Sequence, residues 1–468
     1  MKNTLQLRVS RFSRAGLAVG AAMVLGLGAA GGSNAQSIPI PAPSSQTAPS
    51  AATPDNGPPP PTPEAKREAS SLPRTFPSQP GVTGDWGGLR TTLSQDGVDV
   101  FGSYQIQGGY VTAGKDPGSD FNNQFILGAN LDLQKLLGLD DATFTLAVAD
   151  RFGHNISLRT GAKVILDGNY GEGETFRLAN MSLKQNLFNG RVAYQIGYFP
   201  AAAEFDYSPL LCSFLNQGLC GHPNSLGADS SGFQNPPGGQ LGGRITFFPL
   251  PDLYLKLAVF AVDPPLFTTD YEGFRLGLRD ATGAIYLTEL GWTPERGLLN
   301  MPGHYKIGAY YDSSAAPDVV KPKIMHTGRY NGWLYADQMV WAFDASARRG
   351  LYVFGNATDA NRTNSQISTY FSAGFVANGP IAARPDDVLS IGWAKSNLNP
   401  RKFEAEIIAK PTFGYFSAEQ YYEVSYKLQL RPWLFVTPDL QYVQDPGAFT
   451  AQKFKNATVV GAAMGIAF

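Results

Sequence analysis

The sequence predicts an all-β protein that crosses a membrane as a transmembrane antiparallel β-barrel of about 16 strands. Three observations carry this prediction. Side chains alternate between apolar and polar in many short runs, and long connections alternate with short ones between those runs. After the N-terminal leader, no apolar run approaches the length of about 18 residues that a membrane-spanning helix needs, whereas alternating strands of about ten residues span a bilayer when the sheet closes.

The segment EQYYEVSYKLQLRPW shows the alternation most clearly. Glu423, Lys427 and Arg431 share one parity, and Tyr422 and Val424 share the other. A period of two places successive side chains on opposite faces of a strand. Because one face is charged and the other apolar and aromatic, we expect the apolar face to meet lipid and the polar face to line a water-filled lumen.

The same rhythm recurs along the chain. Long connections follow the odd-numbered strands and tight turns follow the even-numbered ones, which places both termini on the turn side. A soluble sandwich also alternates, but aromatic residues near strand ends are typical of membrane-interface girdles and favour the barrel. The expected strands are 98–111, 121–135, 142–152, 173–186, 190–199, 239–248, 252–262, 282–293, 303–312, 331–343, 349–357, 367–377, 387–396, 417–430, 432–443 and 456–468.

The N-terminal part of the chain has a different composition. Residues 1–35 contain a basic start, an apolar run and a small-residue triplet, which is the layout of a secretory signal peptide. Residues 36–80 are dominated by Pro, Ala, Ser and Thr, so we expect a disordered, polyproline-like linker. No second change in composition follows, and one large barrel domain over residues 98–468 is the simplest interpretation.

The composition excludes several classes of function. Charged residues make up 16% of the chain and the formal net charge is −1, so no basic field is available for nucleic acid. The sequence has no Gly-x-Ser-x-Gly elbow, its 4 histidines are scattered, and no phosphate loop or metal-ligand spacing is present. We therefore expect neither an enzyme nor a cofactor or metal site.

The chain has 2 cysteines, Cys212 and Cys220, in a stretch rich in Pro, Gly and Asn. In an exported protein a pair this close in sequence is expected to form a disulfide that closes a loop, with a stabilisation of roughly 2–3 kcal/mol in the chain-entropy model. A redox or metal pair is the alternative, but no histidine or third thiol lies at ligand spacing.

Three stretches carry a resemblance to a known family. They are GVTGDWGGLRTTLSQDGVDV at 81–100, the block that begins ETFRLANMSLKQ at 174–223, and EQYYEVSYKLQLRPWLFVTPDLQYVQDPG at 419–447, together with the closing GIAF. With the strand rhythm, the similarity extends over about residues 81–468. The chain resembles the carbohydrate-selective porin family, OprB type, of bacterial outer membranes.

The resemblance implies passive diffusion of glucose and similar monosaccharides through a 16-stranded barrel that is narrowed by loops folded into the lumen. It also implies a short periplasmic helical segment over residues 81–97 and a loop disulfide between Cys212 and Cys220. The expected location is the outer membrane of a Gram-negative bacterium. A general or anion-selective porin for other small solutes is the alternative.

The expected partners follow from this setting. They are sugars, outer-membrane lipid and lipopolysaccharide, and the outer-membrane assembly machinery, which would meet the C-terminal Phe468. The chain is expected to be a monomer or a homotrimer, and the sequence pattern does not decide between them.

A neutral sugar offers hydroxyl groups and an apolar ring face, which suit guanidinium donors, carboxylate acceptors and an aromatic plate. Arg151 is the first candidate, because its parity places it on the lumen face and its RFGHNISL setting resembles the family's Arg-x-Gly-x-x-x-Ser-Leu stretch. The alternative is a structural arginine tied to carboxylates of the barrel wall. Glu174 and Arg177 are further candidates whose parities differ, so a strand distortion is needed to aim both inward.

The remaining candidates are Glu204, Asp206 and Tyr207, in a long connection that either folds into the pore or ends in a solvated tip. Charged residues of the polar parity are expected to form a wetted lumen wall, in which charges usually contact water rather than substrate. The residues expected there are Arg244, Lys306, Glu423, Lys427 and Arg431.

Overall fold

The computed structural model describes residues 81–169, 175–264, 273–274 and 276–468. The signal peptide expected at 1–35 and the linker expected at 36–80 lie outside the described residues. In the described part of the chain, no helix has the length and apolar character that crossing a membrane requires.

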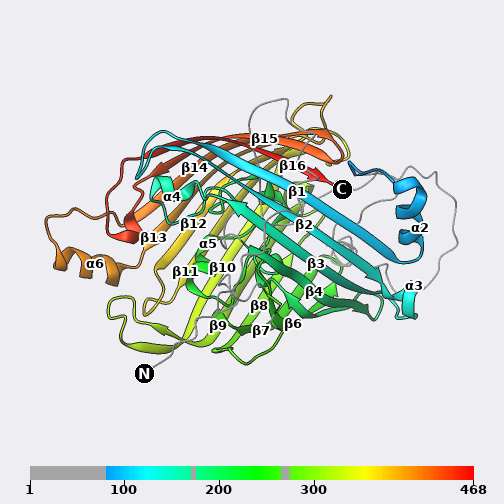
Figure 1. Cartoon of the computed structure of the whole chain (residues 1–468), viewed down its shortest axis with the longest axis horizontal. Helices are drawn as coiled ribbons and strands as arrows, with labels where there is room; N and C mark the ends of the chain where they lie inside the picture. Colours follow the sequence, from blue (N-terminus) through cyan, green and yellow to red (C-terminus); the bar gives the residue numbers. More distant parts are fainter. Residues whose placement is uncertain (1–80, 170–174, 265–272, 275) are drawn as a thin grey trace, which may run out of the picture.

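Sixteen strands close into one antiparallel barrel (Figure 1). Each strand pairs with its neighbours in sequence, and β1 pairs with β16 to close the sheet. The predicted fold class is therefore confirmed. The strands are β1 Val98–Val111, β2 Gly118–Asp132, β3 Ala142–Gly153, β4 Thr175–Leu187, β5 Val192–Phe199, β6 Gln240–Leu250, β7 Leu253–Val262, β8 Gly283–Trp292, β9 Gly303–Pro317, β10 Met325–Ala342, β11 Gly350–Ala360, β12 Ile367–Asn378, β13 Val388–Leu398, β14 Ala418–Arg431, β15 Leu434–Gln444 and β16 Ala457–Ala467.

Several strand boundaries differ from the prediction; the ninth strand, for example, extends to Pro317 instead of residue 312. The second strand ends at Asp132 instead of residue 135, because the Asp132 carboxylate accepts the backbone N–H groups of Gln134 and Lys135, at 3.0 and 3.2 Å, and starts helix α3 (Leu133–Leu137). The tenth strand begins at Met325 instead of residue 331. A register shift between Thr327 and Arg329 interrupts the alternation of this strand, so a period-two pattern does not detect its first residues.

The outward face of the barrel is apolar, as predicted. In β14, Tyr422 and Val424 are 39% and 44% exposed, whereas Glu423 and Ser425, on the opposite face, are 1% exposed. Exposed Leu, Ile, Val, Phe and Tyr side chains recur on the same outward parity around the sheet. This belt of exposed apolar side chains, with every strand paired, is the arrangement that a lipid bilayer requires.

A short helical segment covers the seam between β1 and β16 at the turn end of the barrel. It consists of η1 (Trp86–Gly88) and α2 (Leu89–Gln95), in agreement with the helix expected at 81–97. The Arg90 guanidinium donates to the backbone oxygens of Phe468 and Val100, at 2.7 and 3.2 Å. Figure 1 shows α2, α3 and the C-terminus at the same end of the barrel.

The long loops lie at the opposite end, and two of them enter the lumen. We name the described part of the loop after β3, residues 154–169, L2, and the loop after β5, residues 200–239, L3. In Figure 1, α5 lies inside the outline of the barrel and α6 projects beyond the loop end. The remaining helices are α4 (Ser157–Thr160) in L2, η2 (Ala201–Ala203), η3 (Pro209–Ser213) and α5 (Asn224–Asp229) in L3, η5 (Leu298–Asn300), α6 (Pro400–Ala409) and η6 (Ala448–Thr450).

Candidate functional site

L3 is fastened to the inner wall of the barrel along nine consecutive strands. In the described residues, L3 forms hydrogen bonds with side chains of every strand from β7 to β15. The wall residues that hold it are Lys256, Glu289, Lys306, Asn331, Asn356, Tyr370, Ser390, Glu423 and Gln441. A loop held at so many points fills this side of the lumen and narrows the passage.

The first part of L3 contains two of the predicted site residues, Glu204 and Asp206. The Glu204 carboxylate lies 3.0 Å from Nε of Arg244 on β6. The Asp206 backbone N–H donates to Glu289 at 2.7 Å, and its carboxylate accepts from the Asn356 amide at 3.0 Å. In the structure these candidates therefore act as anchors of L3, and the predicted wall residue Arg244 is one of their partners.

Asp206 lies in an energetically unfavourable environment. Its side chain is fully buried and its φ of +49° lies in the left-handed region, which non-glycine residues rarely adopt. Burial raises the pKa of the Asp206 carboxyl well above its usual value, and the nearby charge of Glu289 raises it further. The surrounding wall must hold this turn of L3 firmly to maintain it.

The third predicted loop residue, Tyr207, lies next to the cysteines. Its hydroxyl is 3.3 Å from the Cys212 sulfur, and its backbone oxygen accepts from Nζ of Lys306 at 2.6 Å. Cys212 and Cys220 are not joined by a disulfide bond in the structure. A hydrogen bond with Cys220 lowers the pKa of the Cys212 thiol, so the two sulfur atoms are neighbours. The predicted disulfide remains a proposal.

The far part of L3 is held by β14. The Glu423 carboxylate accepts two consecutive backbone N–H groups of L3, from Leu215 at 2.7 Å and from Asn216 at 2.9 Å. The Asn216 side chain continues to Gln441 on β15 at 3.0 Å. Glu423 faces the lumen as predicted by parity, but its contact is with the loop rather than with open water.

Trp333 also belongs to this interior. Its parity and burial, at 2% exposed, place it inside the barrel, where Nε1 donates to Glu289 at 3.0 Å. Its ring packs edge-on against Phe205 of L3 at 6.4 Å between centroids. Trp333 thus stabilises the position of L3 and is not part of an interfacial aromatic girdle.

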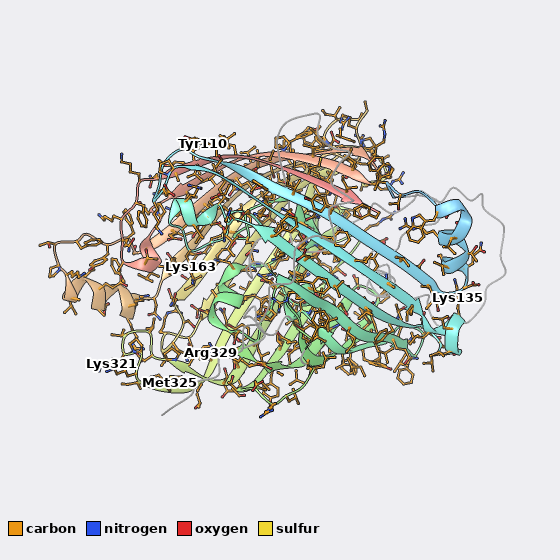
Figure 2. All side chains as sticks on the ribbon, in the orientation of Figure 1. Tyr110, Lys135, Lys163, Lys321, Met325 and Arg329 are labelled. Carbon is orange, nitrogen blue, oxygen red and sulfur yellow. The ribbon has the colours of Figure 1, made fainter. Side chains whose placement is uncertain are left out.

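L2 meets L3 across the lumen. The backbone N–H of Gln217 donates to the Ile165 oxygen at 2.9 Å, and its side-chain amide donates to the Gly168 oxygen at 3.2 Å. The backbone N–H of Lys163 donates to Glu419 on β14 at 2.9 Å. Figure 2 places Lys163 toward the loop end of the barrel, on the opposite side of the molecule from Lys135 in α3.

The inner wall of β1 to β4 carries a polar block that includes Arg151. Gln105, Gln124 and Arg151 are register partners on three adjacent strands, all with buried side chains. The Arg151 Nε donates to Gln124 at 2.6 Å, and its Nη2 donates to the backbone oxygen of Pro236, at the end of L3, at 3.2 Å. The structure therefore places Arg151 in the lumen, between an amide of the wall and the end of L3.

Arg177 joins the same block through a distortion of β4. The pairing of β3 with β4 shifts between Ala147 and Val148, which leaves Ala179 as an extra residue. Beyond this bulge Arg177 pairs with Ala149 and Thr175 pairs with Arg151, so the two arginines are diagonal neighbours on the lumen face. The bulge aims Arg177 inward, but it does not lie between Glu174 and Arg177, so it is not the distortion that would aim both residues inward. Glu174 lies outside the described residues.

Several amide side chains of the block were missed by the sequence reasoning. Gln107 and Asn122 are register partners one row from Arg151, and Gln107 accepts from the backbone N–H of Asn169 in L2 at 3.3 Å. The Asn169 side-chain amide is fully buried and has no hydrogen-bond partner within the described protein, and the same holds for Oε1 of Gln105. The available signal was the cluster of Gln and Asn on the polar parity of the first two strands.

The last two predicted wall residues lie apart from this block. Nζ of Lys427 is 4.6 Å from the ring centroid of Phe435, on the lumen side of β14 and β15. Arg431 is exposed where β14 ends at the turn, and its guanidinium donates to the Leu430 backbone oxygen at 3.0 Å. Neither residue is brought close to Arg151 by any contact of the described residues.

Comparison with known proteins assigns the chain to a family. Residues 118–468 match the model of the carbohydrate-selective porin family, OprB. Porin B of Pseudomonas aeruginosa is 30% identical over 425 residues, which cover 82% of this chain and 90% of that protein. The putative porin QuiX of Acinetobacter baylyi is 28% identical over 413 residues, covering 83% of this chain and 93% of that protein.

A solved structure has the same architecture. The high-pH structure of OprB from Pseudomonas putida superposes with a TM-score of 0.77 at 30% sequence identity, covering 83% of this chain and 99% of that one. The match includes the closed barrel, and the family is one of diffusion channels without covalent chemistry. The chain therefore belongs to the carbohydrate-selective porin family, OprB type, and is a carbohydrate porin rather than an enzyme.

Proposed function

We propose that the chain passes glucose and similar monosaccharides through the outer membrane of a Gram-negative bacterium, and that the polar block on β1 to β4 is the substrate contact. The observation that carries this proposal is the distribution of the loops. L3 occupies the wall from β7 to β15, whereas Arg151, Arg177 and the amides lie on the other wall, next to the place where L2 and L3 meet.

The chemistry of the block suits an uncharged polyol. Guanidinium and amide groups both donate to hydroxyl oxygens, and amide oxygens accept from hydroxyl hydrogens. Arg151 and Arg177 are each 1% exposed, so the surrounding wall and loop residues cover both guanidinium groups in the structure. Each hydrogen bond to the sugar replaces one to water, which keeps binding weak enough for release.

The partners follow from this placement. The short turns, α2 and the C-terminus would face the periplasm and the long loops the exterior. Phe468, whose backbone N–H donates to Gly102 at 2.9 Å, ends the closing strand and is the residue that we expect the outer-membrane assembly machinery to recognise. The outward belt would contact outer-membrane lipid and lipopolysaccharide, as a monomer or a homotrimer.

Replacement of Arg151 tests the proposed contact. Arg151→Ala removes a charge-assisted donor worth about 1.5–3 kcal/mol, so we expect glucose to block single-channel current at least about tenfold more weakly. Arg151→Lys keeps the charge without the planar fork and should recover only part of the block. The matched control is Thr145→Val, on the same strand and face, whose hydroxyl donates to Asn130 at 3.0 Å.

Liposome swelling separates the proposal from its rival. Faster swelling with glucose than with an anion of similar size supports the proposed function. A swelling rate that is the same for different sugars but depends on the charge of the solute would instead indicate a general or anion-selective porin. Unchanged block of the current by glucose in Arg151→Ala would show that this arginine has only a structural role in the barrel wall.

A further inference from the structure

Lys427 differs from five other basic side chains of the inner wall. Each of the five contacts L3 through a hydrogen bond or an ion pair, and they are Arg151, Arg244, Lys256, Lys306 and Arg329. Lys427 faces the same lumen and is partly exposed, but it forms no hydrogen bond or ion pair within the described part of the chain. Its ammonium group therefore has N–H donors that L3 does not use.

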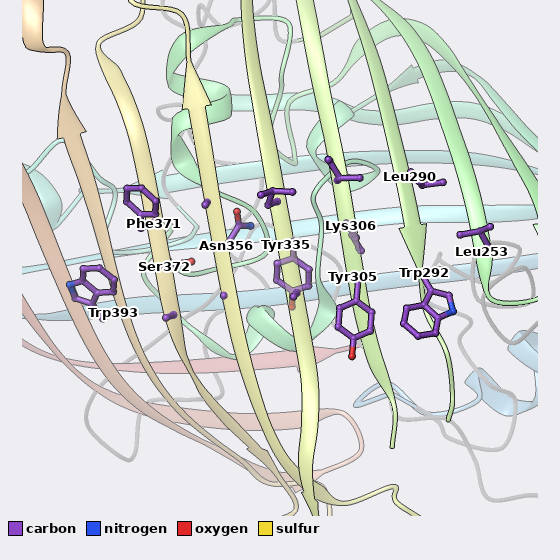
Figure 3. Close-up of a pocket in the computed structure, with 16 residues that line it drawn as sticks. Leu253, Leu290, Trp292, Tyr305, Lys306, Tyr335, Asn356, Phe371, Ser372 and Trp393 are labelled. Carbon is purple, nitrogen blue, oxygen red and sulfur yellow. The ribbon is translucent and has the colours of Figure 1, made fainter. Parts of the chain in front are cut away.

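Lys306 is a useful comparison, because both lysines lie over an aromatic ring. Nζ of Lys306 is 5.7 Å from the ring centroid of Tyr335, its register partner, and Figure 3 shows the two side chains on neighbouring strands. The same Nζ donates to the Tyr207 oxygen of L3 at 2.6 Å. Nζ of Lys427 lies closer to its ring, 4.6 Å from the centroid of Phe435, and has no acceptor in L3. Lys306 thus holds the loop, whereas Lys427 is held by a ring alone.

Phe435 is a firm support for this ammonium group. Its side chain is 4% exposed and lies over Gly465 of β16, where any Cβ would overlap the ring atoms. The ring is therefore enclosed between the backbone of β16 and Lys427. Because a cation is attracted to the face of an aromatic ring, this arrangement limits where Nζ can lie without using its N–H donors.

Lys427 lies on the turn side of L3. The Ser425 hydroxyl donates to the Ser213 oxygen of L3 at 3.1 Å. Lys427 follows two residues later on the same face of β14, about 7 Å nearer to the turn. The pKa of the Cys212 thiol is lowered by its hydrogen bond with Cys220 and also by the charge of Lys427, so the ammonium group is close to this part of the loop.

One row of the wall leads from Phe435 to the polar block. The successive register partners in this row are Phe435, Gly465, Gln105, Gln124 and Arg151. They lie on five adjacent strands, so the row extends about 19 Å along the wall. Gln105, in the middle, has a buried side-chain oxygen without a partner in the described protein. The two ends of the row are too far apart for one monosaccharide to contact both, but a sugar can contact them in succession.

We propose that Lys427 is a second sugar contact on the turn side of L3 and that Phe435 is its positioning residue. The inference rests on the proposed passage of monosaccharides. An ammonium group donates up to three hydrogen bonds, which suits the hydroxyl oxygens of a sugar that has moved past Arg151. Two weak contacts in sequence favour passage more than a single strong one, because each permits release.

Acidic side chains on the same face do not neutralise this lysine. The Glu423 carboxylate accepts backbone N–H groups of L3, and the Asp439 carboxylate accepts from the Gln441 amide at 2.8 Å. Neither forms an ion pair with Lys427 in the part of the chain that the structure describes. The charge therefore stays available to oxygen atoms of a solute, and the experiment must separate a neutral sugar from an anion.

Single-channel recording with glucose added to one side at a time tests the proposal. Lys427→Met removes the donors and keeps a side chain of similar length. We expect the association rate of glucose added on the turn side to fall at least about fivefold, and the rate from the loop side to change less than about twofold. Lys427→Arg should keep most of the block. Phe435→Leu should lose part of it, because the charge remains but its position is no longer fixed.

Two other lysines provide controls. Lys306→Met removes a hydrogen bond to L3, so it should increase the noise of the open-channel current. Lys453→Met should behave as the native chain. Lys453 is exposed in the loop before β16, and its Nζ lies 4.8 Å from the ring centroid of Phe416, so it has the same kind of ring contact outside the lumen.

The outcomes are distinct. Unchanged turn-side block in Lys427→Met would overturn the proposal, and so would a change confined to the ion selectivity of the current, which would assign the lysine to small anions. Native block with the increased noise of Lys306→Met would show that Lys427 is an anchor of L3 and would overturn it as well. A native chain that glucose blocks from neither side would refute the proposed function itself. Loss of block in Arg151→Ala but not in Lys427→Met would remove only the second contact.

Discussion

The contact between Glu423 and L3 is the most direct test of how the channel is narrowed. Glu423 is 1% exposed and accepts the backbone N–H groups of Leu215 and Asn216 at 2.7 and 2.9 Å. Glu423→Ala removes both acceptors and leaves two buried donors of L3 without partners. The strand itself should not unfold, because the pairing of β14 with β13 and β15 uses backbone groups.

The size of the effect follows from these two bonds. Leaving a buried donor without a partner costs about 1–3 kcal/mol, so the variant loses about 2–6 kcal/mol of attachment at this point of L3. Since about 1.4 kcal/mol corresponds to a factor of ten, the form in which L3 is released at β14 becomes at least about 25-fold more populated. The side-chain bond from Asn216 to Gln441 at 3.0 Å retains part of the contact.

Liposome swelling with glucose and with a disaccharide measures the consequence. Release of L3 at β14 widens the passage there, so Glu423→Ala should admit the disaccharide and should show larger, noisier single-channel currents. Glu423→Gln keeps one acceptor oxygen and should be intermediate, while Thr145→Val should behave as the native chain. A Glu423→Ala channel with native conductance and native exclusion of the disaccharide would refute the idea that L3 sets the pore.

Three other predictions concern the loop and the seam. Burial raises the pKa of Asp206, so between about pH 4 and that raised pKa the folded chain keeps a proton that the unfolded chain has lost, and stability falls as pH rises. Asp206→Asn should flatten this slope in thermal unfolding at pH 4 to 8, and two parallel curves would contradict the assignment. Cys212 and Cys220 should be oxidised in the exported protein, with a mass about 2 Da below that of the reduced form. Reduction should increase the noise of the single-channel current without unfolding the barrel. Unfolding of the barrel on reduction would show that the pair does more than close a loop. Arg90→Ala should lower the temperature at which the barrel unfolds on gels, because it removes the 2.7 Å hydrogen bond to the Phe468 backbone oxygen. An unchanged temperature would show that the pairing of β1 with β16 closes the barrel without help from Arg90.

The strands were predictable because their information is local. A lipid-facing side chain every second residue is a requirement of the bilayer, and it marks β14 in the sequence as clearly as in the structure. The observed strands differ from the predicted ones where a helix cap or a β-bulge interrupts the alternation. Asp132 ends β2 by capping a helix, and the bulge at Ala179 moves Arg177 to the lumen face. Parity alone does not tell which face Arg177 occupies, and the pairing of β4 with β3 places it on the lumen face.

The role of each charged residue in the lumen was not predictable, because it depends on contacts between distant parts of the chain. Parity places Glu423 and Arg244 inside the barrel, but the same parity serves a side chain that meets water and one that holds a loop. Leu215 and Glu423 are separated by 208 residues in sequence, and no local pattern links them. L3 is anchored by polar side chains from β7 to β15, and Arg151 on β3 also donates to L3 at Pro236. Contact of the polar groups of β1 to β4 with a sugar stays a prediction. The amides beside Arg151 are uncharged, which is the property that a passage for neutral sugars needs and that a search for charged residues overlooks.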